Sequence, residues 1–156
     1  MPKITTFLTF NHQAEEAITL YTSIFKNSKI LDTRRWGDGG PGPKGSLMTA
    51  TIELDGTRLM VLNGGPSFGF APGIWLFVSC ETQEEIDALW SKLAAEGQEV
   101  QCGWVTDKFG VSWQIIPSVL GELLGDKDPA RAGRAMNAML QMKKLDIAAL
   151  KRAHAG

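Results

Sequence analysis

The sequence predicts an α+β fold built from two similar βαβββ halves and followed by helices. Two amphipathic helical segments of matching design lie 69 positions apart, at residues 14–25 and 83–94. Each follows a short run rich in strand-forming residues, and each precedes a hairpin pattern. The chain has 156 residues, 44% hydrophobic and 21% charged, as in one globular domain. Because half a chain of this size buries too little surface to be stable alone, we expect one domain over residues 1–156.

The first half, residues 1–63, begins with a predicted strand at residues 4–10. The helix of residues 14–25 repeats apolar side chains at the spacing of one buried face, with Asn11 able to cap its start and Asn27 its end. A further strand is expected near residues 29–36. Residues 49–62 have the pattern of a hairpin around the Asp55-Gly56 turn. This half therefore has the order strand, helix and three strands.

The second half, residues 74–118, repeats this order after a linker at residues 64–73 that is rich in glycine and proline. Its first strand is expected at residues 74–80. Thr82 and Glu85 form a capping box before the second helix, in which Trp90 belongs to the buried face. Strands near residues 99–102 and on both sides of the turn at residues 107–110 complete the repeat.

Residues 119–156 form a predicted helical extension. Asp128-Pro129 is a helix start, and Asp146 caps a last short helix. The intervening stripe of Met136, Met139, Leu140 and Met142 is apolar packing. We expect it to pack against a second copy of the chain in a homodimer, the alternative being that it folds back over its own sheet.

Composition excludes several classes of function. Sixteen basic and seventeen acidic residues give a net charge of -1 without long runs of one sign, so we expect neither nucleic acid nor membrane as a partner. No apolar stretch is long enough for a signal peptide or a membrane span. The two cysteines form no disulfide framework, which favours a cytoplasmic protein.

The doubled βαβββ plan resembles the vicinal oxygen chelate superfamily, the group of glyoxalases, extradiol dioxygenases and bleomycin-resistance proteins. The phrases AEEAITLYTSIF, LNGGPSF, CGWVTDKFGVSWQIIP and MKKLDIAALKRA are similar to its PhnB-like branch, whose members often carry the label 3-demethylubiquinone-9 3-methyltransferase. The resemblance implies an incompletely closed barrel of eight strands with a concave pocket, usually in a homodimer.

The resemblance also implies where a metal would lie, since the superfamily holds its metal with His and Glu side chains on the first and last strands of each half. Those positions fall near Phe7, Met60, Leu76 and Gln114. Three are apolar and the fourth is a neutral amide, which are poor ligands for Zn²⁺, Fe²⁺ or Ni²⁺. We therefore expect no metal and no other cofactor.

The candidate ligand-binding residues are polar or aromatic side chains expected on the strands. Gln114 is a hydrogen-bonding group in the pocket or else a cross-strand amide. One of two neighbouring arginines should point to the concave side, where a guanidinium can grip a carboxylate or phosphate. Cys102 lacks a nearby base and is expected to be inert. The full set is Gln114, Ser112, Thr9, Asn63, Trp75, Trp104, Arg34 and Arg35.

These residues favour the binding of a small, partly aromatic or anionic organic molecule, with no catalytic residue assigned. The alternative is a metal-dependent lyase, isomerase or dioxygenase of the same superfamily, and a pure interaction module is a third possibility. Methyl transfer from S-adenosylmethionine is less favoured, because the sequence lacks the glycine-rich first turn of a doubly wound sheet. The glycines of residues 37–46 form a hairpin tip, since no helix follows to receive a phosphate.

Overall fold

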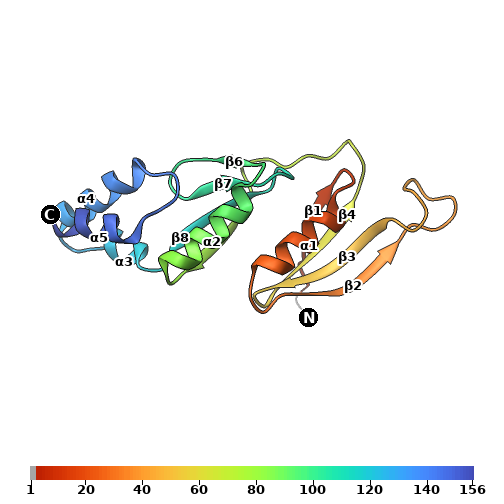
Figure 1. Cartoon of the computed structure of the whole chain (residues 1–156), viewed down its shortest axis with the longest axis horizontal. Coiled ribbons are helices and arrows are strands. Elements are labelled where there is room, and N and C mark those ends of the chain that lie inside the picture. Colours follow the sequence, from red (N-terminus) through yellow and green to blue (C-terminus); the bar gives the residue numbers. More distant parts are fainter. Residues whose placement is uncertain (1–2) are drawn as a thin grey trace. The chain divides into compact units, whose positions relative to one another are not determined.

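A computed structural model describes residues 3–156, so the first two positions of the expected first repeat lie outside the described residues. The chain divides into two compact units, residues 1–70 and 71–156, and each contains one four-stranded mixed sheet (Figure 1). Neither sheet closes on itself. The predicted α+β class and the two strand-helix-strand-strand-strand repeats are confirmed.

In the first unit the sheet order is β1-β4-β3-β2, with β1 parallel to β4 and the other neighbours antiparallel. Figure 1 shows α1 lying along this sheet. The elements are β1 (Thr6–Phe10), α1 (Ala14–Ile24), β2 (Lys29–Arg35), β3 (Leu47–Leu54) and β4 (Thr57–Asn63).

One face of the first sheet is buried under α1, and the other is open. Because side chains alternate across a strand, Ala50 and Ile52 of β3 and Val61 of β4 are buried, whereas the residues between them are more accessible. The apolar stripe of α1, which includes Ile18 and Tyr21, is fully buried in return. Any ligand chemistry of this unit therefore belongs to the face away from α1.

The start of α1 is capped from a distance, and the prediction that Asn11 caps it is wrong. The helix begins after Gln13, whose side chain makes no capping bond. Instead the Asn63 Oδ1 atom, at the end of β4, accepts a hydrogen bond from the Ala14 amide at 2.9 Å, and its Nδ2 atom donates to the Leu47 carbonyl at 3.0 Å. Asn63 thus joins the helix start to two strands of the sheet.

The second unit repeats the first with shorter outer strands. Its sheet order is β5-β8-β7-β6, with β5 parallel to β8, and the expected strand near residues 99–102 is only two residues long and lies earlier. Thr82 caps α2 as predicted, accepting from the Glu85 amide at 3.2 Å. The elements of the repeat are β5 (Leu76–Cys80), α2 (Gln83–Ala94), β6 (Gln98–Glu99), β7 (Trp104–Thr106) and β8 (Ser112–Pro117).

The helix-covered face of the second sheet is built around Trp113, which is 2% exposed. Its indole Nε1 atom donates to Asp107 Oδ2 at 2.9 Å, and Asp107 Oδ1 accepts from the amides of Phe109 and Val111. Asp107 is itself buried. Since each of these buried groups has a partner, the β7–β8 turn is fixed by its own carboxylate.

The C-terminal extension consists of α3 (Leu120–Leu124), α4 (Pro129–Leu140) and α5 (Ile147–Ala155), grouped beyond the end of β8 in Figure 1. Asp128 and Asp146 cap α4 and α5 as predicted. Its apolar core includes Ile116 of β8 together with Leu120, Leu123, Ala135, Leu145 and Leu150. Within the described residues no helix combines the length and apolar character needed to cross a membrane.

The methionine stripe is divided between this core and the surface. Met139 and Met142 pack against the core of the extension, whereas Met136 and Leu140 are 40% and 49% exposed. The tail therefore folds back onto its own unit through half of the stripe. Met136 and Leu140 are four residues apart, so their exposed side chains are neighbours on one face of α4.

Candidate functional site

The strand pairings place Thr9 and Arg34 on the open face of the first sheet. Arg34 of β2 lies opposite Thr49, Thr49 opposite Leu62, and Leu62 opposite Thr9. These four side chains form one row across all four strands, since directly paired residues point to the same face. The neighbouring row contains Asp32, Thr51, Met60 and Phe7.

Arg35 lies on the opposite, helix-covered side, where it binds the start of α1. Its guanidinium donates to both carboxylate oxygens of Glu15, at 2.6 and 3.1 Å. This hydrogen bonding lowers the pKa of Glu15. Arg34 makes no ion pair with any residue in the range 3–156, so it is the guanidinium of the two that remains available to an anionic ligand.

Asn63 is committed to the structure and does not belong to the open face. It lies opposite Phe10, which is buried on the α1 side. Its amide oxygen and nitrogen are both engaged in the bonds to Ala14 and Leu47. We therefore leave Asn63 and Arg35 out of the candidate site.

On the second sheet, the open face brings Gln114 between two aromatic rings. Gln114 of β8 lies opposite Trp104 on one side and Phe77 on the other. Trp75, just before β5, packs on Trp104 with ring centroids 4.3 Å apart and an interplanar angle of 56°. Phe77 and Trp75 are 59% and 43% exposed, and Gln114 is half-buried. These exposed rings and the amide are the most distinctive chemistry of the unit.

Phe77 is a further residue of the candidate site that the sequence did not indicate. The alignment with the superfamily pointed to Leu76, but Leu76 pairs with Trp113 on the covered face, whereas Phe77 pairs with Gln114. The available signal was alternation, because Phe77 lies two positions from Trp75. Ser112 also faces this side, opposite Thr106, but it is only 9% exposed.

The two thiols differ in accessibility. Cys80 is buried, and burial raises its pKa to about 12, so it stays protonated and unreactive at neutral pH. Cys102 is half-buried and free, with a positive φ of 58° in the turn before Trp104. Asp107, in the turn that follows β7, is buried.

The positions where the superfamily holds a metal do not fit one. Phe7 pairs with Met60 in the first unit, and Phe77 pairs with Gln114 in the second. Two phenyl rings, a thioether and a neutral amide provide neither imidazole, carboxylate nor thiolate to a divalent ion. Among residues 3–156 there is also no group of three or more His, Cys, Asp or Glu side chains suited to a metal.

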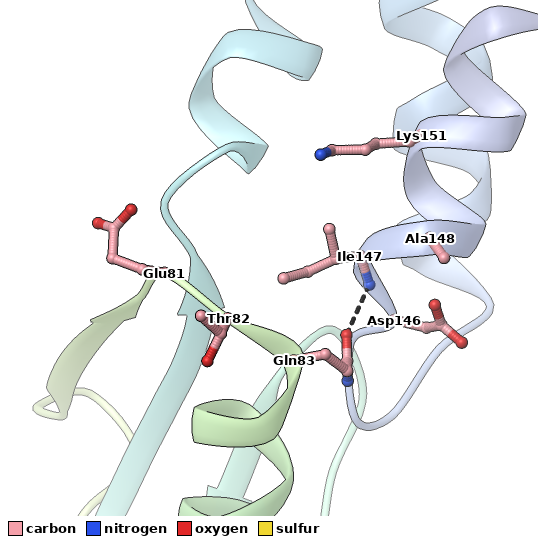
Figure 2. A pocket seen from close by; sticks show the side chains of 7 residues that line it. All are labelled: Glu81, Thr82, Gln83, Asp146, Ile147, Ala148 and Lys151. Atoms are coloured by element: carbon pink, nitrogen blue, oxygen red, sulfur yellow. Dashed lines mark hydrogen bonds between the residues drawn. The ribbon is translucent and has the colours of Figure 1, made fainter.

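A surface pocket of about 360 Å³ lies where the extension meets the start of α2. Figure 2 shows Ile147 and Lys151 of α5 reaching toward Glu81 and Thr82, with Gln83 at the junction. The Gln83 Oε1 atom accepts from the Ile147 amide at 2.8 Å. Because its polar groups cap helices and join them, the pocket is first of all a structural junction.

Trp36 belongs to the glycine-rich hairpin tip and is covered by it. A side chain at Gly42 would collide with the Trp36 indole, and one at Gly40 would lie 2.7 Å from it. The Trp36 amide donates to the Ser46 carbonyl at 2.9 Å, which closes the base of the tip. The glycines at these positions thus allow the chain to fold closely over the ring.

Comparison with known proteins places this geometry in a family. The family model described as 3-demethylubiquinone-9 3-methyltransferase matches residues 2–116. No curated protein matches the chain. Among solved structures, a PhnB protein of Bacillus cereus, described as a putative 3-demethylubiquinone-9 3-methyltransferase, is 40% identical, with a TM-score of 0.71. The match covers 75% of this chain and 100% of that one.

More distant structures share the fold alone. Protein PA1353 of Pseudomonas aeruginosa is 23% identical over 75% of this chain and 98% of its own, with a TM-score of 0.63. The fosfomycin resistance protein FosX of Listeria monocytogenes is 14% identical over 80% and 98%, with a TM-score of 0.57. The chain therefore belongs to the 3-demethylubiquinone-9 3-methyltransferase family, and it shares its fold with the fosfomycin resistance protein.

Proposed function

We propose that this protein binds a small organic molecule with a flat apolar part on the open face of its second sheet. One observation carries the proposal: the half-buried Gln114 amide lies between Trp104 and Phe77, with Trp75 packed against Trp104. Side chains this apolar are seldom left exposed together without a partner. The name of its family, 3-demethylubiquinone-9 3-methyltransferase, refers to an organic molecule with a flat ring, and it supports the same conclusion.

The chemistry of the site matches a ligand that combines a ring with a polar group. Indole and phenyl faces stack on flat rings, and burial of these surfaces supplies most of the affinity. The Gln114 amide offers one acceptor and two donors, so it orients a carbonyl, hydroxyl or amide of the ligand. Ser112, deeper on the same face, offers a hydroxyl beside it.

The open face of the first sheet is a separate candidate surface, where Arg34 favours an anionic group. Arg34 is exposed, and it lies next to the Thr49 hydroxyl across the β2–β3 pair. A guanidinium binds carboxylate or phosphate through two parallel hydrogen bonds. Thr9, in the same row, is a further polar contact. The first sheet thus offers an anionic ligand a surface of its own, distinct from the aromatic site of the second sheet.

Binding without metal chemistry fits these residues better than the enzymatic alternatives. The paired positions Phe7, Met60, Phe77 and Gln114 lack the donors that a metal-dependent lyase, isomerase or dioxygenase needs. The family description names a methyltransferase, but two mixed four-stranded sheets differ from the doubly wound parallel sheet of common S-adenosylmethionine enzymes. We assign no residue a catalytic role.

The assay for this proposal measures binding of 2-naphthoate, a flat aromatic carboxylate, by quenching of tryptophan fluorescence. Gln114→Ala should weaken binding about fivefold, the value of roughly one hydrogen bond, while the Tm stays within a few degrees of the parent's. Gln141→Ala removes an exposed glutamine in the extension and is the matched control. Unchanged affinity in Gln114→Ala, or loss explained by unfolding, would make Gln114 a structural cross-strand amide.

The natural ligand is found separately. Metabolites that remain bound during purification can be identified by mass spectrometry after denaturation of the protein. A compound that combines a flat ring with an acidic or hydroxyl group supports the proposed site, provided that Trp104→Ala reduces its recovery. A ligand that binds equally to Trp104→Ala contradicts it.

We also propose a cytoplasmic homodimer. Both cysteines are free thiols, as is usual in a reducing compartment. The exposed side chains of Met136 and Leu140 on α4 offer an apolar surface for a second copy. The double variant Met136→Lys, Leu140→Lys should be a monomer, and light scattering measures this change. Asn137→Lys, which changes an exposed neighbouring position, is the control and should remain a dimer. A double variant that remains dimeric excludes this surface.

A further inference from the structure

We propose that the C-terminal extension positions the Trp104 indole and so sets the shape of the aromatic site. This inference rests on the site proposed above, because it assigns a role to helices that contain none of the ligand-facing residues. The family model ends at residue 116, and the Bacillus cereus protein is covered completely by three quarters of this chain. The extension therefore lies outside the segment that the family model matches.

The extension holds the turn that leads into Trp104. The amide of Cys102 donates to the Met142 carbonyl and that of Gly103 donates to the Lys143 carbonyl, both at 2.8 Å. Cys102 and Gly103 have φ angles of 58° and 82°, and this left-handed region is unfavourable for Cys102, whereas glycine adopts it readily. Two backbone bonds from the extension thus stabilise an unfavourable local conformation immediately before the indole.

Gly103 is confined on the sheet side as well. Its carbonyl accepts from the Ile115 amide at 2.7 Å. An added Cβ atom would lie 2.8 Å from the Ile115 carbonyl oxygen and 3.3 Å from the Leu145 Cδ1 atom. The turn is therefore enclosed between β8 and the extension. A shift of the extension would move the turn and, with it, Trp104, the next residue of the chain.

Residues 142–147, whose Met142 and Lys143 carbonyls accept these bonds, are held in place by contacts of their own. Leu145 is fully buried in a cluster with Ile116, which lies two positions from Gln114 on the same strand face. The Gln83 side chain donates to the Leu145 carbonyl at 3.0 Å and accepts from the Ile147 amide at 2.8 Å (Figure 2). Gln83 and Leu145 are thus positioning residues that act on Trp104 through the turn.

The test uses full-length variants and needs no ligand. The indoles of Trp75 and Trp104, with ring centroids 4.3 Å apart, should give an exciton couplet in the circular dichroism spectrum. Loss of this signal in Trp75→Phe would assign the couplet to this pair. Gln83→Ala and Leu145→Ala should each reduce this couplet at least about twofold. They should also accelerate hydrogen exchange of the Cys102 and Gly103 amides about fivefold, as for the loss of roughly one hydrogen bond.

Two controls separate positioning from general stability. Glu84→Ala changes the exposed neighbour of Gln83 in the first turn of α2. Leu123→Ala removes a leucine from the same cluster as Leu145, and Leu123 is not among the residues nearest to Gly103. Both should leave the couplet and the exchange of Cys102 and Gly103 unchanged.

An unchanged couplet in Gln83→Ala would overturn the inference, as would an equal loss in Leu123→Ala. If Leu145→Ala does not fold, Gln83→Ala decides alone, because it leaves the core intact. The outcome is also distinct from that of the proposed function. A couplet that responds to the extension in a protein that fails to bind 2-naphthoate supports positioning and refutes the binding site.

Discussion

The two units share one topology but stabilise equivalent points by different means. In the first unit, α1 has no capping side chain of its own and depends on Asn63, 49 residues away. In the second, α2 is capped by Thr82 at its own start. The hairpin turns also differ. The first turn consists of the exposed Asp55-Gly56 pair, whereas the second turn closes around the buried side chain of Asp107.

This difference shows that a repeated fold fixes which backbone groups need a hydrogen-bond partner. It leaves open which residue provides that partner. A helix start needs acceptors for its free amides in both units, and each unit found one from a different part of the chain. The same freedom separates the open faces. Phe7 and Met60 in one unit correspond to Phe77 and Gln114 in the other, and only the second pair carries a polar group.

The hairpin contrast gives the largest expected effect. Asp107→Ala leaves three buried N–H donors without their acceptor, so it should lower the free energy of unfolding by about 3 kcal/mol. Asp55→Ala, at an exposed turn position with a φ of 45°, should cost about 1 kcal/mol, because alanine tolerates this conformation less well. Urea unfolding measures both. Equal costs would show that the buried carboxylate contributes nothing special.

The helix starts give an intermediate effect. Asn63→Ala removes the cap of α1 and the partner of the Leu47 carbonyl, and should cost about 2 kcal/mol of unfolding free energy. Thr82→Ala removes one local cap and should cost about 1 kcal/mol. The comparison is made by urea unfolding of the two single variants. A larger loss for Thr82→Ala would contradict the long-range capping of α1.

The smallest effect concerns the two neighbouring arginines. Arg35→Ala should raise the pKa of Glu15 toward its ordinary value, because the hydrogen bond that lowers it is lost, whereas Arg34→Ala should leave it unchanged. A lowered carboxyl pKa stabilises the fold above the unfolded-state pKa, and this contribution is lost as the pH falls through the folded-state pKa. NMR titration of Glu15 checks the shift. A response to Arg34→Ala would mean that Arg34 shares the helix-side contact.

The sequence by itself determined what depends on near neighbours. The helical stripes around Tyr21 and Trp90, the Thr82 cap and the helix start at Asp128-Pro129 follow from local spacing, and so does the repeat as a whole. Helix periodicity and capping involve residues within about one turn, so their signals are complete in a short window. The family resemblance was equally available, because it rests on contiguous phrases.

Only the tertiary structure decided which side chains reach the open faces. Counting by twos from the apolar Ile30 would place Arg34 under α1, but the irregularity between Ile30 and Asp32 reverses the face of the residues that follow. One position likewise separates Leu76 from Phe77. Strand register and distant caps such as Asn63 are set by contacts between remote segments, and a one-residue slip exchanges the two faces, so no local pattern fixes them.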